Sequence, residues 1–150
     1  MTRMIRFTVL GEPVAKGRAK TRNFVTKDGR QFTQQYTPEK TRRYEESVKW
    51  AFLEQCPGQR FEDDDALWIT LHIYKSIPKS MTKRNRTRID VGELFPGKRP
   101  DGSNILKAIE DALNRIAYRD DSQIVRFDVE QYYSETPRVE VEIQAIGKIV

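Results

Sequence analysis

Residues 99–114 read Arg-Pro-Asp-Gly-Ser-Asn-Ile-Leu-Lys-Ala-Ile-Glu-Asp-Ala-Leu-Asn, and residues 120–124 read Asp-Asp-Ser-Gln-Ile. From about Ser103, apolar residues recur at the spacing of one helix face, which predicts an amphipathic helix with a single buried stripe. The residues of this stripe are Ile105, Ile109, Ala112, Leu113 and Ile116. At about 100° per residue, the opposite face collects the polar residues Asn104, Lys107, Asp111 and Asn114.

Acidic residues stand at both ends of this predicted helix. Asp101 lies just before it, where its carboxylate either caps free N–H groups or projects beyond them. Asp120 and Asp121 lie in a turn after the helix, directly before a predicted strand. The two acidic positions meet only if the fold brings them together. A strand that runs antiparallel to the helix axis is the arrangement we expect to do this.

The flanking sequence predicts several strands. Side chains alternate between apolar and polar, as they do in half-buried strands, over residues 5–10, 66–74, 124–133 and 138–146. The run 66–74 is the expected central strand, covered on both sides. Residues 124–146 are expected to fold as an antiparallel hairpin.

A second helix is expected from Pro38 to Cys56, with Thr37 as its hydroxyl cap. The 150 residues suit one globular domain, because 37% are hydrophobic and 33% are charged. We therefore expect a single domain over residues 1–150 of the α+β class, with a mixed β-sheet and two main helices. The predicted order is β-α-β-α-β-β, with a basic N-terminal ribbon.

Two basic segments lie between these elements. Residues 14–22 are basic and weakly structured, and residues 24–26 and 31–33 flank Asp28-Gly29, a strong hairpin-turn signal, so a short basic ribbon is expected here. Residues 78–97 show no sustained period and are too long for an ordinary connection. We interpret residues 78–97 as a functional loop that is ordered by substrate.

The net charge of +5 is concentrated in two stretches of the chain. Nine Lys or Arg residues fall within 14–43 and eight within 75–99, against two acids in each stretch. One basic segment would be an ordinary solvated surface, whereas two that flank an acidic motif indicate a surface that binds nucleic acid. The expected phosphate contacts are Lys16, Arg18, Lys20, Arg22, Lys83, Arg84, Arg86 and Arg88.

The composition excludes several kinds of site. Cys56 is the single cysteine, so an internal disulfide is impossible, and no set of Cys and His has zinc-site spacing. His72 is the single histidine and falls within a strand, which favours a packed or surface role over catalysis. The acidic run 63–65 is interpreted as a solvated turn. No apolar run reaches membrane-spanning length and no signal sequence is apparent, so we expect a cytoplasmic protein.

Asp101, Asp120 and Asp121 are hard oxygen ligands of the kind that Mg²⁺ or Mn²⁺ prefers. Carboxylates alone would repel a nucleic-acid phosphate. A divalent ion bridges the two, polarises the phosphoryl oxygen and lowers the pKa of a bound water. Lys107, one turn into the helix, is suited to neutralise charge on the phosphoryl group. The spacing equally allows a structural interpretation. In it, Asp101 caps the helix, Asp120 and Asp121 form a turn, and Lys107 with Asp111 is an i,i+4 ion pair.

Three motifs follow one another in the central stretch. Their residues are Pro100, Asp101, Asn104 and Lys107, then Asp111, Ala112, Leu113 and Asn114, then Asp120, Asp121, Gln123 and Ile124. They resemble the signature of the RusA-type Holliday junction resolvases, which reads Pro-Asp-x-Asp-Asn-x-x-Lys, Asp-Ala-Leu-Asn and Asp-Asp-x-Gln-Ile. The early segment Gly11–Arg18, with Tyr36-Thr-Pro38 and Tyr44-Glu45, is also similar to members of that family.

The resemblance implies a small homodimeric endonuclease that cuts four-way DNA junctions with Mg²⁺, for which Mn²⁺ is a possible substitute. It implies that Asp101 and Asp121 are metal ligands and catalytic residues. Asp120 is implied as a ligand or an orienting residue, and Lys107 as a catalytic residue that stabilises negative charge.

One position departs from the family pattern. The acid that directly precedes the asparagine in the family is Ser103 here, and it is one of the implied metal positions. Serine is neutral and a weak ligand, although it can hold a metal-bound water or cap the helix. Asp111 and Asp120 are the acids expected to compensate for the lost charge.

These observations support two main hypotheses. The first is a Mg²⁺-dependent, structure-selective endonuclease that resolves four-way junctions by paired phosphodiester hydrolysis. The alternative is a weakened or non-catalytic protein that binds junction DNA, in which Ser103 replaces a metal-ligand acid. A third hypothesis, an RNA-binding module, is less favoured because the sequence has no aromatic-rich RNA-recognition signature. Cleavage of a junction separates the first two, and competition between duplex RNA and junction DNA tests the third.

Overall fold

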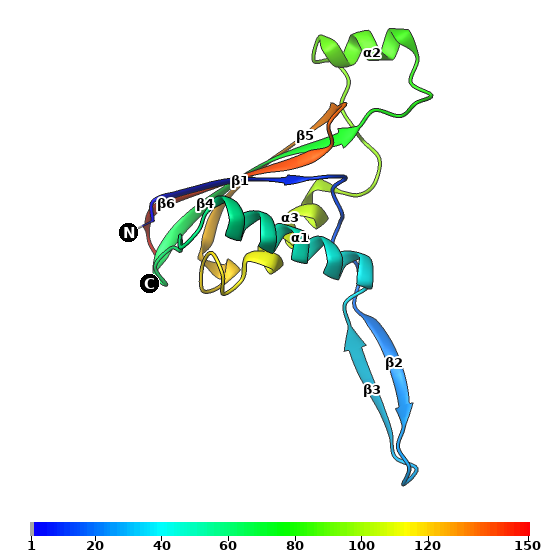
Figure 1. Ribbon diagram of the computed structural model, residues 1–150, viewed down its shortest axis with the longest axis vertical. Helices are drawn as coiled ribbons and strands as arrows, with labels where there is room; N and C mark the ends of the chain where they lie inside the picture. Colours follow the sequence, from blue (N-terminus) through cyan, green and yellow to red (C-terminus); the bar gives the residue numbers. More distant parts are fainter. Residues whose placement is uncertain (1) are drawn as a thin grey trace.

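Four strands form one mixed sheet in the computed structural model, which describes residues 2–150. The strands are β1 (Met4–Leu10), β4 (Asp65–Ser76), β5 (Ile124–Ser134) and β6 (Arg138–Lys148). Their order across the sheet is β1-β6-β4-β5 (Figure 1). β4 pairs in parallel with β5 and antiparallel with β6, which in turn pairs antiparallel with β1. The predicted α+β class with a mixed sheet is confirmed.

The central strand is β4, as predicted. Leu67, Ile69, Leu71 and Ile73 alternate along it and are fully buried. They face α1 (Glu39–Gln55) and α3 (Gly102–Leu113), which lie together on one side of the sheet (Figure 1). The expectation that β4 is covered on both sides is wrong. The other face of the sheet is open and carries polar pairs between neighbouring strands, such as Arg6 with Glu142.

The predicted hairpin of residues 124–146 is also wrong. β5 and β6 are consecutive in the chain, but β4 lies between them and pairs with both. The three residues 135–137 span that gap, because four Cα steps reach about 13 Å and one intervening strand requires about 9.6 Å. An alternating pattern predicts a strand but does not predict which strands pair with it. The sequence is therefore compatible with either strand order.

The core lies between the helices and the sheet. α1 contributes Val48 and Phe52, and Phe52 meets Phe7 of β1 edge to face at 5.6 Å between ring centroids. α1 begins after Pro38 without the predicted side-chain cap from Thr37. The predicted stripe of α3 is buried as far as Leu113, where the helix ends, so Ile116 lies in the turn that follows.

The segment interpreted as a loop contains a third helix, α2 (Lys83–Asp90). None of its residues is buried, which is why no apolar period reveals it in the sequence. The side chain of Thr82 caps the helix by accepting a hydrogen bond from the Asn85 N–H at 3.2 Å. α2 stands apart from the sheet at one end of the molecule (Figure 1).

The basic ribbon is confirmed and is longer than its sequence signal. It consists of β2 (Lys20–Val25) and β3 (Gln31–Tyr36), an antiparallel pair with Asp28-Gly29 in the turn. Gly29 has φ of +82°, a left-handed conformation that glycine adopts without strain. The ribbon projects away from the sheet at the end opposite α2 (Figure 1).

The turn between α3 and β5 is fixed by one buried side chain. Gln123 lies in a short 3₁₀ helix, η1 (Asp121–Gln123), and is fully buried. Its Oε1 accepts hydrogen bonds from the N–H groups of Arg119 at 2.9 Å and Asp120 at 3.2 Å. Its Nε2 donates to the carbonyls of Glu62 and Asp65 before and at the start of β4. The acidic turn is thereby tied to the sheet.

Among residues 2–150, none of the helices has the length and apolar composition that crossing a bilayer requires.

We expect Gln123→Ala to lower the free energy of unfolding by about 2–4 kcal/mol, because four backbone groups lose their partner at a buried position. Urea denaturation with an unchanged m-value measures the loss. Gln34→Ala, at an exposed position of β3, is the matched control and should change stability by less than about 0.5 kcal/mol. Equal stability of Gln123→Ala and the parent would contradict the conclusion that Gln123 holds the acidic turn on the sheet.

Candidate functional site

The polar face of α3 gathers charged side chains from distant parts of the chain. The Lys107 Nζ lies 3.2 Å from Oδ1 of Asp111, one turn further along the helix. The same Nζ lies 3.4 Å from Oδ2 of Asp121, which belongs to the turn before β5. Asp111 and Asp121 are both partly buried. Two carboxylates therefore converge on one cation position.

A second lysine reaches this face from the N-terminal part of the chain. The Lys16 N–H donates to the Asn104 carbonyl at 2.9 Å, so the segment before the ribbon runs along α3. The Lys16 Nζ pairs with Asp111 at 3.2 Å and with Glu45 of α1 at 2.7 Å. Gly17 allows the same segment to pass close to the start of α1, because a Cβ there would lie only 3.0 Å from side-chain atoms of Pro38 and Thr41.

The two lysines remain protonated in this setting. Burial lowers the pKa of Lys107, but Asp111 and Asp121 raise it, and the net shift is upward. For Lys16, burial likewise lowers the pKa while Glu45 and Asp111 raise it, again with a net increase. Both side chains are therefore suited to stabilise negative charge and unsuited to accept a proton.

Glu110 is the acid whose protonation is most altered. It is 9% exposed, and burial raises its pKa to about 7, with further increases from the nearby charges of Asp121 and Asp111. Lys107 opposes this rise. The raised pKa of Glu110 therefore reflects first its burial and then the negative charge of Asp121 and Asp111.

A different set of groups surrounds the start of α3. Asp101 occupies the N-cap position, yet its side chain caps no N–H group and makes no ion pair within residues 2–150. The alternative in which Asp101 projects beyond the helix is thus the observed one. Lys75 lies beneath this turn and donates to the carbonyls of Lys98 at 2.9 Å and Pro100 at 2.5 Å. An open cleft in front is lined by Ala15, Lys16, Arg18, Arg99, Pro100, Asp101 and Asn104.

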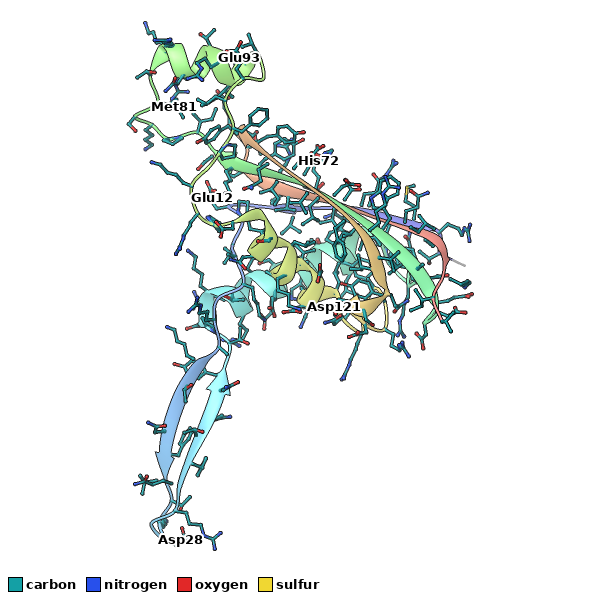
Figure 2. The ribbon with its side chains drawn as sticks, turned by 180° about the vertical axis from the view of Figure 1, so that it is seen from behind. Glu12, Asp28, His72, Met81, Glu93 and Asp121 are labelled. Atoms are coloured by element: carbon teal, nitrogen blue, oxygen red, sulfur yellow. The ribbon has the colours of Figure 1, made fainter. Side chains whose placement is uncertain are left out.

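The structure separates the acids that the sequence analysis grouped. β5 does run antiparallel to α3, since a Cβ on Gly102 would touch Gln131 and Val129. This direction leaves Asp121 at the far end of the helix (Figure 2), where its carboxylate pairs with Lys107, which also pairs with Asp111. Asp101 and Asp111 are ten residues apart, about 15 Å along a helix axis. Asp121 therefore pairs with Lys107 beside Asp111, whereas Asp101 makes no ion pair within residues 2–150.

The two remaining predicted metal positions differ in their surroundings. Asp120 accepts a hydrogen bond from the Ser122 N–H at 3.1 Å and caps η1, so its carboxylate has a structural partner. Ser103 is exposed in the first turn of α3 and makes no side-chain hydrogen bond within residues 2–150. Of the two acids expected to compensate for Ser103, Asp111 is therefore the one on the α3 face with Asp121.

The chemistry of the donors fits a divalent metal ion at the Asp111 end of α3. Asp111 and Asp121 offer carboxylate oxygens, the hard ligands that Mg²⁺ selects, and the Lys107 ammonium lies between them, so an ion there requires Lys107 to move aside. Asn114, the C-cap residue of the same helix, has a buried Oδ1 without a hydrogen-bond partner in the described residues. The oxygen-rich polar face is therefore compatible with Mg²⁺ or Mn²⁺.

Another acidic cluster lies elsewhere and has a structural explanation. Glu62, Asp64 and Asp65 are the acids of residues 2–150 that approach each other at metal-ligand spacing. Their carboxylates surround the Lys148 Nζ at 3.0, 3.0 and 2.8 Å. An ammonium group thus occupies the position that a metal would take, and it ties β6 to the turn before β4.

The predicted phosphate contacts fall into three groups in the structure. Lys16 and Arg18 line the cleft at α3, Lys20 and Arg22 lie on β2, and the other four lie on α2. The ribbon and α2 are at opposite ends of the longest axis of the molecule (Figure 1). The eight residues therefore do not form one continuous patch on a single chain.

Sequence reasoning missed three features of this region. The pairing of Lys16 with Asp111 and Glu45 is long-range and has no local signal. The buried Lys75 did have a signal in the sequence. It continues the inward alternation of β4 after Ile73, so it is a charged residue on an otherwise apolar face. The high pKa of Glu110 was also unforeseen, although its position beside the apolar stripe of α3 was visible in the sequence.

Comparison with known proteins identifies relatives of this chain. A family described as endodeoxyribonuclease RusA matches residues 11–144. A protein of Bacillus subtilis (strain 168), named uncharacterized protein YqaN, is 33% identical over 145 residues, which are 95% of this chain and 97% of that protein. The matched residues include the ribbon, the cleft, α2 and the whole polar face of α3.

We expect Glu110 to make the metal-free protein less stable as the pH rises. The folded pKa of about 7 exceeds the ordinary value of 4.5, so the native state keeps a proton that the unfolded chain releases between these pH values. Stability should fall by roughly 2–3 kcal/mol across this window because of Glu110 alone.

Glu110→Gln removes this pH-dependent contribution. Urea unfolding in EDTA from pH 4.5 to 7.5 measures the free energy of unfolding of the variant minus that of the parent. The difference should grow with pH and level off above about pH 7. A difference that stays constant over the whole range would show that Glu110 titrates normally.

Proposed function

This chain belongs to the RusA family of endodeoxyribonucleases, and we propose that it is a Mg²⁺-dependent nuclease that resolves four-way DNA junctions by paired phosphodiester hydrolysis. The observation that carries this proposal is the polar face of α3. There Lys16, Lys107, Asp111 and Asp121 come from separate family motifs and meet within ion-pair distance. Acids and fixed cations on one exposed face suit a metal and a phosphodiester together.

Each residue of the face has a proposed task. Asp111 and Asp121 would hold the metal ion through their carboxylate oxygens, with the Lys107 ammonium moved from between them toward the phosphoryl group. Lys107 stays protonated and would stabilise charge on the phosphoryl group, while Lys16 holds Asp111 in place. When bound, the ion supplies a Lewis acid that polarises the phosphoryl oxygen and lowers the pKa of a bound water.

The start of α3 would receive the DNA strand. Arg18 and Arg99 line the open cleft and carry positive charge toward a phosphate. Asp101 projects into the same region without a partner in residues 2–150, so its carboxylate is available to a metal ion. Lys75 supports the backbone of this turn from below and fixes the direction of the helix start.

A homodimer would allow Asp101 of one copy to serve the same site as Asp121 of the other. Resolution of a junction requires two symmetric cuts, and a two-fold dimer provides two sites. A contact that sets α3 antiparallel to α3 of a second copy would bring the start of one helix to the end of the other. We propose that each site combines Asp101 from one copy with Asp111 and Asp121 from the other.

The primary test is nicking of a synthetic four-way junction with Mg²⁺, compared with linear duplex of the same sequence. Asp101→Asn should reduce cleavage by roughly 10³-fold, since it removes a carboxylate that serves the metal. Junction binding by this variant should be unchanged or tighter, because a charge that repels phosphate is lost. Binding without any cleavage by the parent, in Mg²⁺ or Mn²⁺, would favour the non-catalytic alternative.

A mixed dimer distinguishes a shared site from a site within one chain. Asp101→Asn and Asp121→Asn carry different affinity tags, are co-expressed, and the heterodimer is isolated through both tags. With shared sites, one of the two sites in the heterodimer keeps both acids and nicks the junction, whereas each parent homodimer is inactive. An inactive heterodimer would place both acids of a site in the same chain.

Ser103→Asp tests the departure from the family pattern. The new carboxylate beside Asp101 should tighten Mg²⁺ binding by about 1–2 kcal/mol, roughly tenfold, and raise the nicking rate with it. Titration calorimetry of Mg²⁺ and the nicking assay measure the two effects. Ser80→Asp adds the same charge far from α3 and is the control. Weaker binding and slower nicking would indicate that the site is adapted to serine.

A further inference from the structure

The β2–β3 ribbon is the part of the molecule that buries least. Of its twelve strand residues, eleven are exposed and Phe24 is half-buried. A two-stranded ribbon without a core is marginally stable in water. Here it is supported by its turn, in which the Thr26 N–H donates to the Arg30 carbonyl at 2.8 Å, and by aromatic contacts on one side.

Those contacts define a basic-aromatic face of the ribbon. The register of the two strands directs Lys20, Arg22, Phe24, Phe32, Gln34 and Tyr36 to one side. Phe24 and Phe32 stack at 5.0 Å between centroids. The Arg22 guanidinium lies over the Tyr36 ring at 4.8 Å and the Phe24 ring at 5.9 Å. Four of these side chains are thus engaged with one another, namely Arg22, Phe24, Phe32 and Tyr36.

The opposite side is an amide-hydroxyl face of different chemistry. It consists of Thr21, Asn23, Val25, Gln31, Thr33 and Gln35, and none of them is charged. All six are exposed, and their amide and hydroxyl groups form no side-chain hydrogen bond within residues 2–150. Asn and Gln pair with the major-groove edge of adenine through two hydrogen bonds, and the Thr methyl group contacts the thymine methyl.

The dimensions of the ribbon agree with a DNA groove. Six residues per strand extend about 20 Å, which corresponds to about six base-pair steps of 3.4 Å. The major groove is about 12 Å wide and admits a two-stranded β-ribbon. The ribbon points away from the sheet, so the body does not obstruct such an approach (Figure 1).

We propose that the ribbon enters the major groove of one duplex arm and reads base edges with its amide-hydroxyl face. Lys20 and Arg22, with Lys27 at the tip, reach the flanking phosphates. This inference rests on the proposed function for the class of ligand and adds a sequence preference to it, in favour of adenine and thymine in the contacted arm. A second copy is not the occupant, because residues 20–36 carry four cations against Asp28 and would repel their own copy.

The test uses three variants with junction and linear duplex DNA. One replaces residues 21–35 by a short Gly-Ser linker. One combines Asn23→Ala, Thr33→Ala and Gln35→Ala on the amide-hydroxyl face. The matched control combines Lys20→Ala with Arg22→Ala on the other face.

Methylation of guanine N7 by dimethyl sulfate reports occupancy of the major groove. The parent should protect N7 positions in one patch of an arm, and the linker variant should leave them reactive. The amide-hydroxyl variant should lose roughly tenfold in preference between junctions whose arms differ in sequence. The Lys20/Arg22 control should bind all sequences more weakly and lower the slope of log K against log salt by about 2, with the preference retained.

The outcomes separate this inference from the proposed function. Junction-selective cleavage with N7 protection that persists in the linker variant would overturn the ribbon inference alone. A second outcome is that the parent, but not the linker variant, protects guanine N7 on linear duplex, while neither binds or cleaves a junction selectively. This outcome would support the ribbon inference and overturn the proposed function. A change in oligomeric state on removal of the ribbon, with unchanged N7 reactivity, would assign the ribbon to protein contact and overturn the inference.

Discussion

Burial of the apolar stripe of α3 is the constraint on which the rest of the structure depends. Ile105, Ile109 and Leu113 are fully buried, and each such side chain contributes about 1.5–3 kcal/mol relative to exposure. The helix lies so close to β5 that a Cβ on Gly102 would be 3.0 Å from the Gln131 side chain. The rotation of α3 is therefore fixed, and with it the outward direction of Lys107.

The same packing explains why acids and lysines share one face. With the stripe buried, the residues opposite to it meet the turn before β5 and the segment that carries Lys16. Two carboxylates facing each other would repel, and the ammonium groups of Lys16 and Lys107 offset this repulsion at 3.2–3.4 Å. Burial raises the pKa of Glu110 most, and the charges of Asp121 and Asp111 raise it further. A divalent cation would reduce the repulsion between these carboxylates.

Much of this arrangement could be predicted from the sequence, because it depends on local patterns. The 3.6-residue period identified α3, the Asp28-Gly29 pair identified the ribbon turn, and i,i+4 spacing identified the pair of Lys107 and Asp111. The order of strands was not accessible, since β4 separates β5 from β6 through long-range pairing that alternation does not encode. α2 was missed because a helix with no buried residue has no apolar period. The relation of Asp101 to Asp121 also depends on tertiary structure, namely the antiparallel course of β5.

The arrangement of basic elements limits what kind of ligand can engage them together. α2 and the ribbon have no buried core of their own and stand at opposite ends of the longest axis, with α3 between them (Figure 1). A single phosphate or a short oligonucleotide at the α3 cleft reaches neither end. A ligand that contacts the cleft and both ends must extend beyond the body in two directions and carry negative charge along its length. Duplex arms that diverge from a branch point meet these requirements, because the branch can lie at α3 while separate arms run toward the ribbon and α2. The extended shape of the chain therefore favours a branched polyanion over a compact one, independently of which acids perform the chemistry.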